Sequence, residues 1–174
     1  MVIEINGEGF VIRSWRTGDA NDLSVNANNK KISKNMHEEF PHPYTLEDAK
    51  KYLAERIKEP KLRTSFAIVI NNEVVGGIGI RLEEGINKKT ADIGYWLAEK
   101  YWGKGIITKA IKLITNYGFD NLNLKRIEAR VFPWNKGSQK ALEKAGYVYE
   151  ATLKKSAVKE GKTQDQLVYA KIND

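Results

Sequence analysis

One segment of the 174-residue chain constrains the fold more than any other, because it joins a strand pattern directly to a helix pattern. Residues 91–97 read as a strand, and residues 106–119 repeat apolar side chains at helical spacing. Between them stand Gly103 and Gly105, separated by one lysine, which allow a tight turn and let a ligand approach the backbone closely. A strand, a glycine turn and a helix in this order predict an α/β protein with helices packed on a sheet.

The same periodicities divide the rest of the chain into short elements. No linker, repeat or low-complexity stretch separates them, so we expect a single domain over residues 1–174 with a mixed sheet. Residues 30–43 are expected to be irregular, and Gly118 is expected to end the third long helix. The predicted strands are residues 10–15, 65–70, 73–80, 91–97, 126–131, 147–153 and 164–172, and the predicted helices are residues 19–27, 45 to about 58–60, 106–119 and 138–145.

Three local signals support these boundaries. Thr17 is a candidate N-cap for the first helix, and Thr45 with Asp48 forms a capping-box pattern at the start of the second. Asn71 and Asn72 tolerate the positive φ that a tight hairpin turn between two strands requires.

Composition excludes several classes of site. The chain has no cysteine, so it has no thiol-acyl intermediate and no cysteine zinc site. With only His37 and His42 as histidines, the sequence argues against a Ser-His-Asp triad and against a multi-histidine metal site, so we expect no metal. Neither a secretion signal nor a membrane-spanning apolar run is visible, which favours a soluble cytoplasmic protein.

The charge of the chain says little about partners. Lysine and arginine outnumber aspartate and glutamate by 29 to 22, a formal net charge of +7. A basic chain can bind nucleic acid, anionic lipid or a phosphorylated small molecule. Here the lysine pairs are scattered along the sequence, so a solvated surface is favoured and a nucleic-acid or membrane partner is not expected.

The glycine turn carries a chemical implication of its own. The first amides of a helix have no partner within the helix, and the positive end of the helix dipole lies behind them, so phosphate groups bind there. The segment does not fit the nucleotide pattern GxxxxGK[ST], nor GxGxxG, because residue 108 is threonine. A pyrophosphate site is one interpretation, and a loop whose glycines serve only backbone geometry is the other.

Residues 93–97, residues 102–105, and Asn135 with Ser138 follow one another along the chain as strand, glycine turn and helix start. This ordered set resembles the GNAT superfamily of acyl-CoA N-acyltransferases, and within it the RimJ/RimL-type enzymes that acetylate N-terminal amines of ribosomal proteins. This resemblance implies a mostly antiparallel mixed sheet flanked by helices. It also implies that the strand at residues 91–97 splays from the strand at 126–131 and opens a cleft for acetyl-CoA. The matching segments are residues 43–49, 93–97, 102–105, Asn135 with Ser138, 143–147, and Gly161 with Asp165.

The resemblance also implies which residues bind the cosubstrate. The coenzyme A pyrophosphate is expected on a Q/R-x-x-G-x-G/A loop, here residues 102–107, with Trp102 in the first position and Ile107 where glycine or alanine is usual. The pantetheine arm is expected to pair with strand backbone and with the side chain of Asn135, which otherwise reads as a turn residue before a helix. The implied set is Trp96, Leu97, Ala98, Trp102, Gly103, Lys104, Gly105, Ile106, Ile107, Thr108, Asn135 and Ser138.

Two residues are candidates for proton handling. Ser138 occupies the family position of a hydroxyl that donates to the departing thiolate, although it also reads as a helix N-cap. Asp92, the carboxylate on strand 91–97, is a candidate base acting through water, while a solvated or strand-pairing role is equally compatible. Glu38 and Glu39 are alternative bases that would line an amine site.

The resemblance implies acetyl transfer from acetyl-CoA to a primary amine, directly in a ternary complex. The acceptor is expected to be a protein N-terminus, such as that of a ribosomal protein, or a small amine such as a polyamine or antibiotic. A coenzyme-A-binding or RNA-binding module without catalysis is the alternative, and a homodimer is compatible with the sequence.

Overall fold

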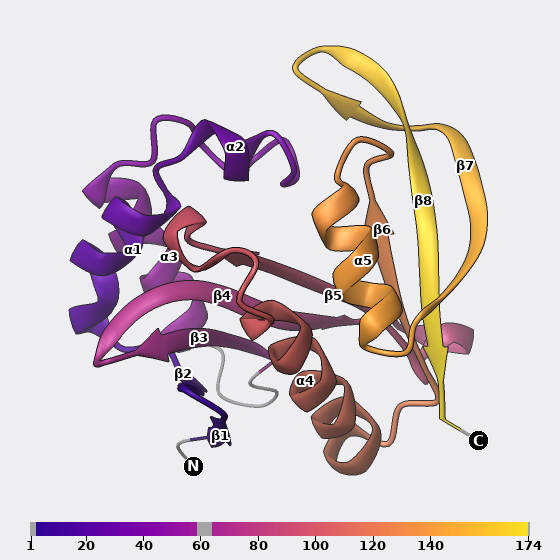
Figure 1. Ribbon diagram of the computed structural model, residues 1–174, viewed down its shortest axis with the longest axis horizontal. Helices are drawn as coiled ribbons and strands as arrows, with labels where there is room; N and C mark the ends of the chain where they lie inside the picture. Colours follow the sequence, from indigo (N-terminus) through magenta and orange to yellow (C-terminus); the bar gives the residue numbers. More distant parts are fainter. Residues whose placement is uncertain (1–2, 59–63, 174) are drawn as a thin grey trace.

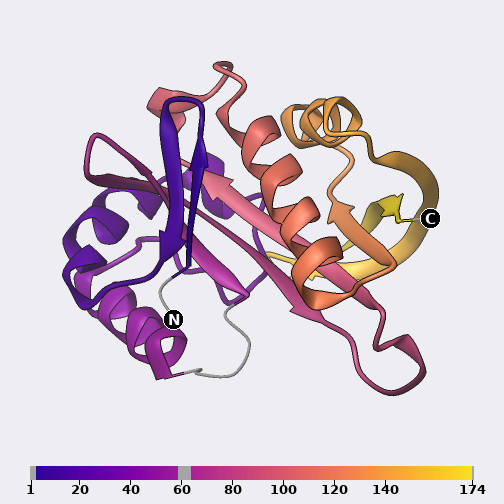
Figure 2. The same ribbon diagram turned by 90° about the horizontal axis from the view of Figure 1, so that it is seen from below.

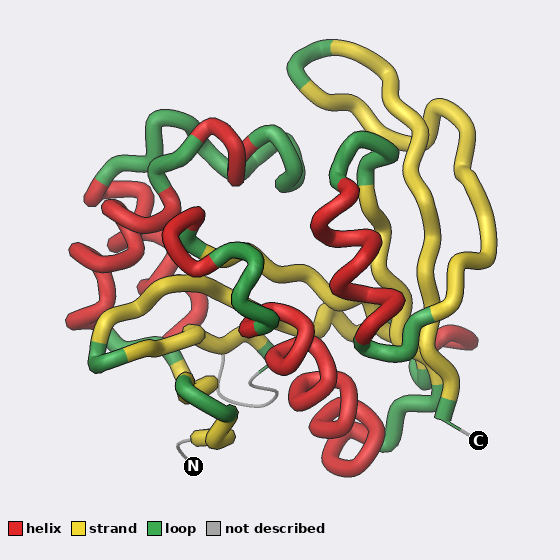
Figure 3. Tube along the Cα trace, viewed as in Figure 1, coloured by secondary structure: helices red, strands yellow, loops and turns green. Residues whose placement is uncertain are grey.

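The computed structural model describes residues 3–58 and 64–173, which form one eight-stranded sheet with helices on both faces (Figures 1 and 3). The strand order is β1-β2-β3-β4-β5-β6-β8-β7. The strands are β1 (Glu4–Gly7), β2 (Phe10–Ser14), β3 (Ser65–Ile70), β4 (Glu73–Leu82), β5 (Thr90–Leu97), β6 (Arg126–Val131), β7 (Val148–Lys159) and β8 (Lys162–Ile172). The helices are α1 (Ala20–Ala27), α2 (Lys30–Ser33), α3 (Leu46–Lys58), α4 (Ile106–Leu122) and α5 (Lys136–Lys144), with 3₁₀ turns η1 (Thr17–Asp19), η2 (Gly85–Asn87) and η3 (Glu99–Tyr101).

The pairing of β5 with β6 sets the shape of the molecule. All other neighbouring strands are antiparallel, whereas these two are parallel, which confirms the mixed, mostly antiparallel sheet. Their pairing covers only residues 90–92 against residues 126–128. Beyond Asp92 and Glu128 the two strands separate, so the splayed strand pair is confirmed.

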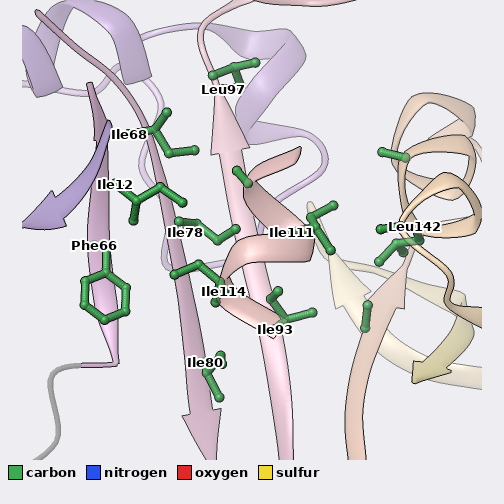
Figure 4. Close-up of a cluster of buried hydrophobic side chains, with 14 of the residues drawn as sticks. Ile12, Phe66, Ile68, Ile78, Ile80, Ile93, Leu97, Ile111, Ile114 and Leu142 are labelled. Carbon is green, nitrogen blue, oxygen red and sulfur yellow. The ribbon is translucent and has the colours of Figure 1, made fainter. Parts of the chain in front are cut away.

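One face of the sheet is covered by α4 and α5. Ile111 and Ile114 of α4 and Leu142 of α5 are fully buried, and they belong to one core with Ile78 and Ile93 of the central strands (Figure 4). Viewed from below, α4 runs across the middle of the sheet (Figure 2). This core holds β4 and β5 in place, and with them the start of the diverging strands.

The opposite face is covered only over its N-terminal half. Leu23 of α1 and Leu53 of α3 pack there against Val74 of β4 in a second buried cluster, which also contains Trp15 and Trp96. This cluster lies over β3 to β5, so the same face of β6 and β8 has no helix on it (Figures 1 and 2).

Several sequence predictions hold at the level of single residues. Asn71 and Asn72 take positive φ values of 50° and 65° in the β3–β4 turn. The capping box is present, since Thr45 N donates to Asp48 Oδ2 and Asp48 N donates to Thr45 Oγ1, at 2.8 and 3.1 Å. The expected helix end near residues 59–60 lies outside the described residues.

The expected helix stop at Gly118 is wrong. The helix α4 continues through this residue to Leu122 and ends at Asn123, which adopts a left-handed conformation with φ of 53°. A Cβ on Gly118 would lie 2.8 Å from the Cδ1 atom of Ile127 and 2.9 Å from that of Ile80. The glycine therefore lets the helix approach the sheet closely and does not terminate it.

The N-terminal third contains two elements that the sequence did not predict. The strand β1 pairs with β2, and α2 lies within the segment expected to be irregular. The first helix begins at Ala20 after a 3₁₀ turn, and Thr17 does not cap it. Instead, Asp19 accepts a hydrogen bond from Arg16 N at 2.8 Å, which closes that turn.

The last two strands form a hairpin longer than expected. The turn lies at Glu160 and Gly161, with φ values of 51° and 70°, and both strands extend towards it beyond the predicted ranges. Figure 1 shows the tip of this hairpin on the same side of the molecule as α2. Across residues 3–58 and 64–173, no helix combines the length and apolar character needed to cross a membrane.

Candidate active site

A cavity of about 700 Å³ opens where β5 and β6 separate. Its walls come from both strands, from the loop between β5 and α4, from the start of α5, and from α2 with the residues that follow it. Segments that are distant in sequence therefore meet around the gap left by the unpaired strand ends.

The cavity has two sides, because side chains alternate along β5. Ile93 and Leu97 belong to the core beneath α4, which defines the α4 side of the cavity. Trp96 belongs to the second cluster together with a residue of α2, which defines the α2 side. Asp92 and Gly94 have the same parity as Trp96 and so lie on the α2 side.

The glycine turn forms a backbone cradle on the α4 side. Gly103 and Gly105 both have φ of 75°, and a Cβ on either residue would meet no atom within 4 Å. The first hydrogen bond of α4 runs from Lys109 N to Gly105 O at 3.1 Å, so the amides of residues 106–108 precede the helical ladder. The loop thus combines open space, unpaired amides and a helix dipole, which together fit a pyrophosphate group.

The lysines of the cradle have partners elsewhere. Lys104 Nζ lies 5.2 Å from the ring centroid of Tyr101, in a cation–π contact, and Lys109 pairs with Glu8 at 2.5 Å. Neither lysine lines the cavity, whereas Ile107 does. The cradle is therefore made mainly of backbone.

Trp102 fixes the start of this loop, a role that the sequence did not reveal. Its indole Nε1 donates to the carbonyl oxygen of Leu97 at 2.7 Å. The bond ties the loop to the C-terminal end of β5 and holds the cradle against the strand from which the cleft opens.

The backbone of β5 offers the cavity different residues from those predicted. Ala98 N donates to Val75 O at 2.7 Å, so this amide points towards β4. Because backbone groups alternate in direction along a strand, the groups of Trp96 also face β4. Of the predicted residues Trp96, Leu97 and Ala98, only Leu97 therefore directs its backbone towards the cleft, and Tyr95 joins it.

The start of α5 brings two hydroxyl groups together on the α4 side. Ser138 Oγ lies 2.6 Å from the hydroxyl of Tyr95, so the pair bridges α5 and β5. The N-cap of α5 is Asn135, whose Oδ1 accepts from Ser138 N at 3.2 Å, so the alternative reading of Ser138 as the N-cap is wrong. Burial raises the pKa of Tyr95 above its ordinary value, which keeps its hydroxyl protonated.

Asp92 lies on the α2 side, at the last position of β5 that pairs with β6. Arg81 Nη2 donates to its Oδ2 at 2.5 Å, and Arg130 Nε lies 3.8 Å from its Oδ1. The alternative bases Glu38 and Glu39 do not line the cavity, whereas both arginines do. In the described part of the chain, no three histidine or acidic side chains cluster so as to hold a metal ion.

Two contacts hold the loop after α2 to other segments of the chain. Trp134 Nε1 donates to Asn35 Oδ1 at 3.0 Å, and the Trp134 ring stacks on Phe132 with 4.4 Å between centroids. At the hairpin tip, Glu160 N donates to Glu38 Oε2 at 3.2 Å. The loop after α2 is thus tied both to the start of α5 and to the β7–β8 turn.

Comparisons with known proteins agree with this architecture. Residues 10–148 match the family model described as the acetyltransferase (GNAT) domain. The "Probable N-acetyltransferase YjcK" of Bacillus subtilis is 45% identical over 85 residues, which are 49% of this chain and 47% of that protein. The chain therefore aligns with about half the length of that curated relative.

Two solved structures are similar over nearly the whole chain. The ribosomal-protein-S5-alanine acetyltransferase of Vibrio fischeri is 26% identical, with a TM-score of 0.86 and coverage of 99% of this chain and 97% of that one. Mycobacterium smegmatis RimJ, solved in complex with CoA-disulfide, is 25% identical, with a TM-score of 0.85 and coverage of 98% and 86%.

Proposed function

The chain belongs to the acetyltransferase (GNAT) domain family, and on that basis we propose that it transfers the acetyl group of acetyl-CoA to a primary amine. The observation that carries this proposal is the cavity between the separated ends of β5 and β6, with a backbone cradle on its α4 side. The cavity also has an α2 side, so a second substrate can reach the centre of the gap. The likeness to a ribosomal-protein acetyltransferase supports a protein N-terminus as acceptor. A small amine is the other candidate.

We assign cosubstrate binding to the α4 side. Gly103 and Gly105, with the amides of residues 106–108, hold the pyrophosphate, because these amides precede the helical ladder. The pantetheine arm lies along the cleft-facing backbone of Tyr95 and Leu97, as an added strand would. Bound there, acetyl-CoA supplies the activated acetyl group. The proposed binding set is Tyr95, Leu97, Trp102, Gly103, Gly105, Ile106, Ile107, Thr108, Asn135 and Ser138.

We assign proton transfer on the α4 side to the hydroxyl pair. Transfer of the acetyl group forms a C–N bond and breaks the C–S bond, so the sulfur requires a proton or a hydrogen-bond donor. Ser138 is placed to donate a hydrogen bond to the sulfur, and Tyr95, which stays protonated, can donate a hydrogen bond to Ser138 in turn. The two hydroxyls form a short hydrogen-bonded chain that stabilises the departing thiolate.

We assign proton removal on the α2 side to Asp92, acting through water. An α-amino group has an unperturbed pKa of about 7.7–8.0, so a moderate base is sufficient, whereas a lysine amine near 10.4 would need more help. Arg81 donates to Oδ2 of Asp92 and so fixes the orientation of the carboxylate. The other oxygen, Oδ1, lies 3.8 Å from Nε of Arg130. We place this activity in the cytoplasm, where acetyl-CoA and newly made protein N-termini are found.

Calorimetric titration with acetyl-CoA, followed by thiol-release assays with a panel of amines and N-terminal peptides, tests the proposal. We expect saturable binding and acceptor-dependent thiol release. No binding at ~1 mM, the upper end of common Michaelis constants, would overturn it. Binding without thiol release for any amine would identify a coenzyme-A-binding module instead. Mass spectrometry of the products distinguishes amine from hydroxyl acetylation.

A further inference from the structure

Arg130 is a cationic side chain on the α2 side of the cavity, and its guanidinium makes no hydrogen bond to a carboxylate of residues 3–58 or 64–173. Its neighbours in β6, Ala129 and Val131, belong to the core beneath α4, so Arg130 points to the opposite side. It lines the cavity, and its side chain is 45% exposed. The nearest carboxylate oxygens, on Asp92 and Glu128, are 3.8 and 3.9 Å away, beyond hydrogen-bond distance.

Two other arginines on the sheet have guanidinium groups that are hydrogen-bonded to carboxylates. Arg13 makes two bonds of 2.8 Å with Asp19. Arg126, on the same strand and face as Arg130, donates to Glu128 at 2.7 Å and to Glu150 at 3.0 Å. Within the described residues, the guanidinium of Arg130 makes no hydrogen bond of this kind. Its fork of five N–H donors therefore remains available to a ligand.

The charge of the cavity favours an anionic ligand at this position. Five of the six aspartate, lysine and arginine side chains that line it are cationic. Glu99 pairs with Lys31, and Asp92 pairs with Arg81. Among the described residues, this leaves Lys34, Arg130 and Lys136 with no carboxylate at hydrogen-bond distance, and Arg130 is the one on β6 where the strands separate. The six side chains are Lys31, Lys34, Arg81, Asp92, Arg130 and Lys136.

We propose that Arg130 selects acceptor amines that carry a carboxylate or phosphate close to the reacting nitrogen. This inference rests on the proposed acetyl transfer and names the acceptor class for the same site. Asp92 and Arg130 lie side by side on the α2 side, with 3.8 Å between Oδ1 and Nε. An amine beside Asp92 therefore places its own anionic group on Arg130 only when a few bonds separate the two groups.

Two sources supply this chemistry. One is a peptide N-terminus with an acidic side chain at its first residue, and the other is a small amino acid. Both would present an oxyanion pair to the guanidinium fork, which binds carboxylate and phosphate in a bidentate manner. Arg130 is half-exposed and its ion pairs with Asp92 and Glu128 are long, at 3.8 and 3.9 Å, so they contribute little to stability and replacing Arg130 leaves the fold intact.

Matched acceptor pairs test the proposal with acetyl-CoA at saturation. One pair is a peptide beginning Asp-Ser and the same peptide beginning Asn-Ser, and the other is serine and serine amide. We expect the acidic member of at least one pair to have a kcat/KM about 10- to 100-fold higher, the range for a hydrogen bond to a charged group. Whichever pair shows the preference identifies the source of the anion.

Two variants separate recognition from a structural role. Arg130→Gln should remove the preference by lowering the acidic member to the level of its neutral partner, with the neutral member and acetyl-CoA affinity unchanged. Arg126→Gln is the matched control, on the same strand and face but fully paired, and it should lower the melting temperature while the preference persists.

The outcomes distinguish this inference from the proposed function. Equal turnover of acidic and neutral acceptors by the wild-type protein overturns the inference and leaves acetyl transfer standing. An equal loss for both members in Arg130→Gln also overturns it, because that loss indicates a structural or general catalytic role. Acetyl-CoA binding without turnover of any amine contradicts the proposed function itself.

Discussion

The α4 side and the α2 side of the cleft are built by different means. On the α4 side the main groups are backbone: two glycines at positive φ, the first amides of a helix and the edge of β5. On the α2 side they are side chains, chiefly Arg81, Asp92 and Arg130, with Trp134 and Asn35 forming a bridge above them. The positions that form a backbone site tolerate few residue types, whereas the specificity of a side-chain site can change by single substitutions. The same cosubstrate site can therefore be combined with acceptor sites of different specificity.

The largest expected effect lies in the backbone cradle. Gly105→Val places a β-branched side chain at φ of 75° and fills the open space above the start of α4. The valine strains the backbone conformation of the loop and occupies the space that the pyrophosphate needs. We therefore expect acetyl-CoA affinity to fall by about 100-fold or more. Calorimetry measures the dissociation constant directly.

Gly85→Val is the matched control for this change. Gly85 also has positive φ, 62°, and open space around its missing Cβ, but it lies in the β4–β5 loop and does not line the cavity. The two variants share the same kind of backbone strain, so Gly85→Val should leave the dissociation constant within a few-fold of wild type. Equal effects of the two would mean that strain, not the site, weakens binding.

This contrast also explains what the sequence could predict. The glycine turn can be predicted from the sequence because glycine adopts its positive φ angles most readily. The asparagine turn at residues 71–72 can be predicted for a similar reason. Gly118 shows the limit of that reasoning, because its glycine is required by close packing against Ile127 of β6 and Ile80 of β4, which lie outside its own helix. Local patterns carry turn chemistry, but they do not carry tertiary contacts.

Most side-chain contacts on the α2 side could not be predicted from the sequence, for the same reason. Alternation places Asp92 and Arg130 on one face of their strands, but the meeting of β4, β5 and β6 decides that Arg81 pairs with Asp92. The bridge between Trp134 and Asn35 joins residues 99 positions apart, and α2 itself is one turn long. Ser138 was found through its motif, but its partner Tyr95 needed the packing of α5 on β5.

The second expected effect concerns turnover on the α4 side. Ser138→Ala removes the hydroxyl that contacts Tyr95, and the loss of one such hydrogen bond, about 1–3 kcal/mol, should lower kcat about 5- to 150-fold. The dissociation constant of acetyl-CoA should stay within a few-fold. Steady-state kinetics and calorimetry on the same preparation separate the two quantities.

A stability measurement makes this prediction sharper. Because Asn135 caps α5 and Ser138 does not, Asn135→Ala should lower the free energy of unfolding by about 1 kcal/mol. Ser138→Ala keeps this cap, so it should lower the free energy of unfolding only through its lost bond to the Tyr95 hydroxyl. Urea denaturation measures both variants. If Ser138→Ala unfolds more easily but keeps full turnover, the hydroxyl is structural and the sulfur receives its proton from another group.

The smallest expected effects compare two tryptophans that make the same kind of bond on opposite sides of the cleft. Trp102 and Trp134 are 43% and 42% exposed, and each donates its indole N–H to one oxygen, at 2.7 and 3.0 Å. Phenylalanine at either position keeps one aromatic ring, and it removes the donor together with the second ring of the indole. The net worth of one hydrogen bond corresponds to about a two- to twelvefold change in a binding constant.

The two substitutions should affect different substrates. Trp102→Phe loosens the loop from Leu97 and should raise the dissociation constant of acetyl-CoA, with the acceptor KM unchanged. Trp134→Phe releases Asn35 and the loop after α2, so it should raise the acceptor KM and leave acetyl-CoA binding unchanged. Each variant is the control for the other, because the chemical change is identical. A shift of the same constant in both variants would show that the two sides of the cleft act as one unit, and the separation between a backbone cosubstrate site and a side-chain acceptor site would fail.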